Sequence, residues 1–99
     1  MMNEIVWEYK EMEALMILQE EAGELTQAIS KCFRFGMDQI KPGQSQSNRE
    51  HLEEELGDLL AMLNLLYDFD IVNMKNVEVA HANKIHKLKQ WSNVFAEEV

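Results

Sequence analysis

The sequence contains few prolines, cysteines and glycines, the residues that interrupt helices or crosslink a chain by disulfides. Its 99 residues include one proline, one cysteine and four glycines. The single cysteine, Cys32, excludes a disulfide framework within the chain, and its place on an apolar helical stripe predicts a core residue. Near the N-terminus, the apolar run at residues 14–18 is too short for a signal-peptide core or a membrane span. We therefore expect one cytoplasmic domain over residues 1–99.

Basic residues are scarce as well. Nine lysines and arginines face 18 acidic residues, which gives a formal net charge of −9. This charge argues against a nucleic-acid polymer or an anionic membrane surface as the main partner. An anionic small molecule remains compatible with it only where metal ions and local lysines offset the field.

Apolar residues recur at spacings of three and four over most of the chain, and this period predicts helices. The first helix is expected from about Asn3 to Phe35. Its apolar stripe drifts between residues 12 and 16, so a bend there is compatible with the pattern. Residues 36–47 lose the period, and Pro42-Gly43 marks a turn within this connection.

Capping signals place the starts of two further helices. Ser47-Asn48-Arg49-Glu50 fits a capping box, and the helix that it opens is expected to end at about Tyr67. Asn73 can cap a third helix that ends at about Trp91. The expected fold is all-α, an antiparallel helical bundle of three main helices with a short C-terminal segment.

The second helix is apolar on almost every side between Leu59 and Leu66. Two neighbouring helices cannot cover so many faces, and a chain of this length often completes its burial by association. We therefore predict a homodimer or homotetramer in which oligomerisation completes the bundle.

Two acidic segments, residues 18–25 and 52–59, nearly repeat each other 34 positions apart. On helices, Glu21 with Glu24 and Glu55 with Asp58 lie along the edges of the apolar stripes. An antiparallel hairpin would bring the four carboxylates together. Without a cation they would repel one another and raise their own pKa values, so the pattern predicts a site for a hard divalent ion.

Each acidic segment also contains a glycine, Gly23 or Gly57, although glycine costs a helix about 1 kcal/mol relative to alanine. A repeated helix-weakening residue needs a reason. Either the two backbones approach closely at these positions, or the glycines leave room for an ion and its waters.

The third helix carries basic and amide donors on one face, Asn83, Lys84 and Lys87. Taken alone, such lysines are ordinary solvated residues, but beside a carboxylate cluster they become candidates for phosphate contact. Trp7 is either a packing residue at the end of the bundle or an aromatic wall for a ligand ring.

The run Glu20-Glu21-Ala22-Gly23-Glu24, followed by Glu55-Leu56-Gly57-Asp58, resembles the EExxE and ExxD signature of the MazG-like all-alpha nucleoside triphosphate pyrophosphohydrolases. This superfamily also includes dimeric dUTPases and phosphoribosyl-ATP pyrophosphohydrolase. The segment with Asn83, Lys84 and Lys87 is similar to the family's Asn-x-Lys-type segment. The resemblance covers roughly residues 5–90, and the 30 residues between Glu24 and Glu55 form a longer gap than usual.

The resemblance implies a catalytic site and a reaction. Glu21, Glu24, Glu55 and Asp58 would bind Mg²⁺, with Mn²⁺ as an alternative, and Glu20 either assists the attacking water or is an exposed helix former. A metal-activated water would attack the α-phosphorus of a canonical, deoxy or modified nucleoside triphosphate and release a monophosphate and pyrophosphate.

Two other classes fit parts of the pattern. A catalytically silent helical interaction module would explain the apolar second helix, with the acids as solvated edges. A ferritin-like redox site uses Glu-x-x-His, but that architecture needs the motif twice, and the chain has it once, at Glu78 and His81.

Overall fold

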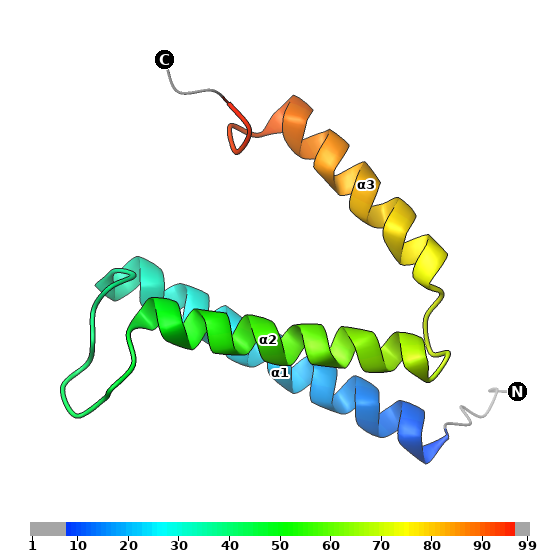
Figure 1. The fold of residues 1–99 in the computed structure, drawn as a ribbon, viewed down its shortest axis with the longest axis horizontal. Helices are drawn as coiled ribbons and strands as arrows, with labels where there is room; N and C mark the ends of the chain where they lie inside the picture. The colour runs from blue at the N-terminus through cyan, green and yellow to red at the C-terminus, as the bar shows by residue number, and fades with distance from the viewer. Residues whose placement is uncertain (1–7, 97–99) are drawn as a thin grey trace, which may run out of the picture.

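The computed structural model describes residues 8–96, and these form three helices (Figure 1). They are α1, Tyr9–Phe35; α2, Asn48–Asp68; and α3, Met74–Trp91. Within the described range the only strand-like pairing is an isolated bridge between Ile40 and Ser47. The all-α prediction is confirmed.

α1 is one uninterrupted helix of 27 residues, so the change of apolar stripe near its start requires no second helix. The predicted start at about Asn3 lies outside the described residues. Glu8 is extended, with φ −69° and ψ 139°, so α1 itself begins only at Tyr9. The helix ends at Phe35, and the residue that follows it, Gly36, has a φ of 91°, which glycine adopts at little cost.

The predicted caps of α2 and α3 are present. The Ser47 hydroxyl accepts a hydrogen bond from the Glu50 backbone N–H at 3.1 Å, and the Glu50 carboxylate accepts one from the Ser47 N–H at 3.1 Å. The Asn73 side chain accepts from the Asn76 N–H at 3.2 Å. Where a helix has a capping residue at its start, the sequence alone thus predicts the first helical residue to within one position.

α1 and α2 run side by side in opposite directions and form a hairpin (Figure 1). The packed centre of this hairpin consists of Ala14, Met62 and Leu66, with Ala28 buried separately. Cys32 is only half-buried, and its thiol lies 3.7 Å from the Asn48 carbonyl oxygen to which it donates. The prediction that Cys32 is a core residue is therefore wrong for the chain by itself.

α3 leaves the end of the hairpin and extends away from it (Figure 1). None of its residues is buried. Its apolar face therefore has no cover in the single chain, and the expected three-helix bundle stays a prediction that depends on an assembly.

Apolar side chains are also left exposed on α2. Leu60 is 59% exposed, and Leu63 and Leu65 are exposed with it, whereas Met62 and Leu66 are buried against α1. The apolar stretch expected to have several covered faces thus has one covered face in the chain alone. No described helix has the length and apolar character needed to cross a bilayer.

Candidate metal centre

Three carboxylates from two helices meet on the hairpin. Glu21 of α1 and Glu55 and Asp58 of α2 each offer an oxygen, and these oxygens all lie within 4.8 Å of one another. The antiparallel course of α1 and α2 brings Glu21 opposite the acid pair of α2. We call these three side chains the carboxylate cluster.

Glu55 is the innermost member of the carboxylate cluster, with 7% of the residue exposed. Its Oε1 lies 3.2 Å from Nε2 of His51, one helical turn earlier. Its Oε2 is buried and has no hydrogen-bond partner. A buried carboxylate oxygen without a partner is costly, and a bound cation would satisfy it. The residues present therefore fit a hard divalent metal ion.

Glu21 is half-buried, and its environment disfavours the ionised form. Desolvation is the largest cause that raises the pKa of Glu21, followed by the negative charges of Asp58, Glu55, Glu24 and Glu20. A cation among the carboxylates would oppose this repulsion and favour the ionised form. The upward shift expected from the acid repeat is thus found at Glu21.

This raised pKa predicts a pH-dependent effect of Glu21→Gln on the metal-free protein. Folding favours the protonated Glu21, so the wild type loses stability as pH rises from about 4.5, the ordinary value for a glutamate, through the raised pKa. The variant has no such charge and should melt at a higher temperature than the wild type at neutral pH. The difference should vanish in acid.

Thermal melts followed by circular dichroism in EDTA, across about pH 4 to 8, test this expectation. Glu13→Gln is the matched control, because Glu13 is exposed on the same helix outside the carboxylate cluster. A Glu21 variant that melts below the wild type at every pH would contradict the account of Glu21.

Glu20 and Glu24 are exposed on α1, and neither belongs to the carboxylate cluster. Glu24 is close enough to Glu21 to raise its pKa. The structure thus brings three of the four expected ligands together. The roles of Glu24 and Glu20 stay predictions.

The two repeated glycines lie in open space. A Cβ added at Gly23 or Gly57 would meet no heavy atom within 4 Å. Close approach of α1 and α2 at these positions, one of the two reasons considered for the glycines, is therefore wrong for the chain by itself. The other explanation, that the glycines leave room for an ion and its waters, stays a prediction.

Gly23→Ala should consequently stabilise the metal-free protein by about 1 kcal/mol, because alanine favours the helix and its methyl group meets nothing. Urea unfolding at fixed protein concentration measures this change. A loss of stability would show that a second copy packs against α1 at Gly23.

The basic residues of the third helix are not brought to the carboxylate cluster within one chain. Asn83, Lys84 and Lys87 are exposed, and they lie on α3, which extends away from the hairpin (Figure 1). Trp7 lies outside the described residues. Glu78 and His81 are exposed on α3, and neither belongs to the carboxylate cluster.

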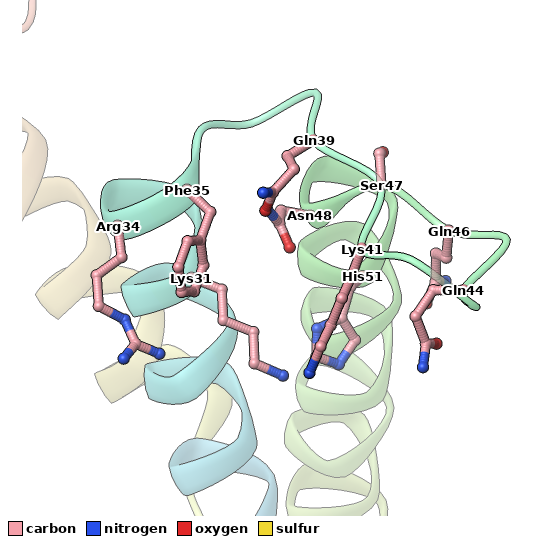
Figure 2. Close-up of a pocket in the computed structure, with 10 residues that line it drawn as sticks. All are labelled: Lys31, Arg34, Phe35, Gln39, Lys41, Gln44, Gln46, Ser47, Asn48 and His51. Atoms are coloured by element: carbon pink, nitrogen blue, oxygen red, sulfur yellow. The ribbon is translucent and has the colours of Figure 1, made fainter.

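Sequence reasoning missed His51, although the four-residue spacing to Glu55 was a usable signal, since such pairs share a helix face. It also missed a cavity of about 450 Å³ beside His51, between the end of α1, the 36–47 connection and the start of α2 (Figure 2). The side chains that line this loop pocket include Lys31, Arg34, Phe35, Lys41, Asn48 and His51.

Residues 10–92 match the model of the MazG nucleotide pyrophosphohydrolase domain. The chain belongs to the MazG family. The matched range contains the whole carboxylate cluster. An uncharacterized Bacillus subtilis (strain 168) protein, YvdC, is 35% identical over 74 residues, in an alignment that covers 71% of this chain and 67% of YvdC. No solved structure matches the chain.

Membership of the MazG family indicates what kind of chemistry the hairpin of α1 and α2 supports. The family is one of nucleotide pyrophosphohydrolases and typically depends on a metal ion, and the carboxylate cluster can bind one. The relative from Bacillus subtilis is itself uncharacterized, so the comparison identifies no substrate.

Proposed function

We propose that this protein is a Mg²⁺-dependent nucleotide pyrophosphohydrolase that converts a nucleoside triphosphate to the monophosphate and pyrophosphate. The substrate is a canonical, deoxy or modified nucleotide, and Mn²⁺ can replace Mg²⁺. The observation that carries the proposal is the buried, unpartnered Oε2 of Glu55 within the carboxylate cluster. MazG family membership supplies the reaction class.

In this proposal Glu21, Glu55 and Asp58 bind the metal, and Glu24 is a fourth donor at the exposed edge. Carboxylate oxygens suit Mg²⁺, which usually retains several waters of its own. When bound, the ion neutralises phosphate charge and lowers the pKa of a coordinated water. His51 lies 3.2 Å from one oxygen of Glu55 and leaves the other oxygen for the metal.

The remaining candidates have positions that fit supporting roles. Glu20 is exposed one residue before Glu21, where it can orient a water at the edge of the carboxylate cluster. Asn83, Lys84 and Lys87 can contact substrate phosphates only if an assembly brings α3 of another copy to the hairpin. Such an arrangement would also cover the exposed apolar face of α3.

A panel of canonical, deoxy and modified triphosphates, followed by ³¹P NMR with and without Mg²⁺, tests the proposal. The expected products are monophosphate and pyrophosphate in equal amounts, formed only when Mg²⁺ is present. Release of single phosphates would contradict the reaction. An absence of turnover across the panel would favour a silent interaction module, and iron loading in air tests the redox alternative by visible absorbance.

A further inference from the structure

We propose that the loop pocket binds a phosphate group of the substrate other than the one held at the carboxylate cluster. This inference rests on the proposed function for the identity of the ligand. That the pocket binds an anion is supported by three independent observations: its positive charge, the convergence of its basic side chains, and the wall that it shares with the carboxylate cluster.

The lining of the loop pocket is positively charged, although the molecule as a whole is negatively charged. Three of the nine lysines and arginines line it, namely Lys31, Arg34 and Lys41, and none of the acidic residues within the described range 8–96 does. In a chain with a net charge of −9, such a segregation of positive charge favours an anionic ligand.

The basic groups converge from different segments. Lys31 extends from α1 and Lys41 from the connection, and both ammonium groups point into the space beside His51 on α2 (Figure 2). Ammonium groups that point at one place repel each other unless an anion lies between them. Compact ammonium charges are suited to phosphate oxygens, which accept several charge-assisted hydrogen bonds.

The connection that carries Lys41 is held in place by specific contacts. The Asn48 N–H donates to the Gln39 carbonyl at 3.1 Å, and the Asn48 side chain donates to the Gly36 carbonyl at 2.9 Å. Arg49 pairs with Asp38 at 3.2 Å. The loop pocket is therefore a formed feature of the hairpin end, and Lys41 is presented by an ordered segment.

The loop pocket and the carboxylate cluster share a wall. His51 lines the pocket, and its Nε2 lies 3.2 Å from Oε1 of Glu55. The two residues are one turn apart, about 6 Å along α2. A nucleotide held at the carboxylate cluster through one phosphate can thus place another phosphate in the pocket. That second group is either the end of the triphosphate or an additional phosphate on the nucleoside.

The anion site is tested by titrating pyrophosphate into the protein calorimetrically in EDTA, where no metal contributes. Lys31→Ala/Lys41→Ala should bind pyrophosphate at least tenfold more weakly than the wild type. Lys75→Ala/Lys89→Ala removes the same charge from α3, outside the loop pocket, and should bind within about twofold of the wild type. Equal weakening in both double variants, or none in either, would overturn the anion site.

Kinetics with Mg²⁺ then identify the phosphate. A tenfold to hundredfold loss of kcat/KM in Lys31→Ala/Lys41→Ala for all triphosphates would assign the pocket to the end of the triphosphate chain. A loss confined to nucleotides with an added 3′-phosphate would assign it to the nucleoside side. Unchanged kcat/KM for both classes would overturn the substrate role. If the wild type hydrolyses no nucleotide, the proposed function fails, and the pyrophosphate titration still decides the anion site.

Discussion

Glu55→Gln is expected to lower kcat at least a hundredfold, a loss of about 2.7 kcal/mol of transition-state stabilisation, while the helical circular dichroism is retained. Glutamine keeps the shape of Glu55 but removes the negative charge from the most buried carboxylate of the cluster. It also leaves only one oxygen, and that oxygen can face His51 rather than the metal. Glu21→Gln and Asp58→Asn should have similar effects.

Glu53→Gln is the matched control for this result. Glu53 is an exposed glutamate of the same helix outside the carboxylate cluster, so its neutralisation should change kcat by less than about twofold. If all three cluster variants keep more than a tenth of wild-type kcat, the carboxylate cluster is not the catalytic metal site. Equal losses in Glu53→Gln and Glu55→Gln would instead indicate an effect of net charge.

Leu60→Glu is expected to convert the assembled protein into monomers that keep their helices. Leu60 is 59% exposed on the apolar part of α2, so a charge there costs the single chain little. In a dimer or tetramer that buries this face, an unpaired carboxylate would be strongly unfavourable. Light scattering at micromolar concentration should give a dimer or tetramer for the wild type and a monomer for the variant.

Leu66→Glu provides the contrast, because Leu66 is 3% exposed in the hairpin centre and its replacement should unfold the chain. A wild type that stays monomeric at micromolar concentration would contradict the predicted oligomer. If the Leu60→Glu variant also unfolds, as is expected of Leu66→Glu, then Leu60 belongs to the core on which the fold depends.

The helices could be predicted because their signals are local. The capping box at Ser47 and the Asn73 cap fixed two starts, and the 3.6-residue period identified all three elements. The predicted start at about Asn3 lies outside the described residues, and α1 begins at Tyr9, directly after Glu8, whose backbone is extended. Cys32 was misassigned to the core because a helical stripe predicts a face and says nothing of how far a neighbour covers it.

The carboxylate cluster was accessible to sequence reasoning because acids beside the apolar stripes of two antiparallel helices lie near the same seam, although Glu24 stays outside the cluster. The loop pocket was not. Lys31 and Lys41 line one pocket only because of the path of the connection, and that path depends on contacts of Gly36, Asp38 and Asn48 that have no periodic signal. The direction of α3 away from the hairpin could not be predicted either, because an amphipathic pattern does not identify which surface covers the apolar face of the helix.

Binding of Mn²⁺, followed by electron paramagnetic resonance without any nucleotide, tests the central claim most directly. The claim is that Glu21, Glu55 and Asp58 form a divalent-metal site. The account predicts that the wild type and Glu53→Gln deplete the signal of free Mn²⁺, and that Glu55→Gln binds at least tenfold more weakly. Equal Mn²⁺ binding by the wild type and Glu55→Gln would contradict it.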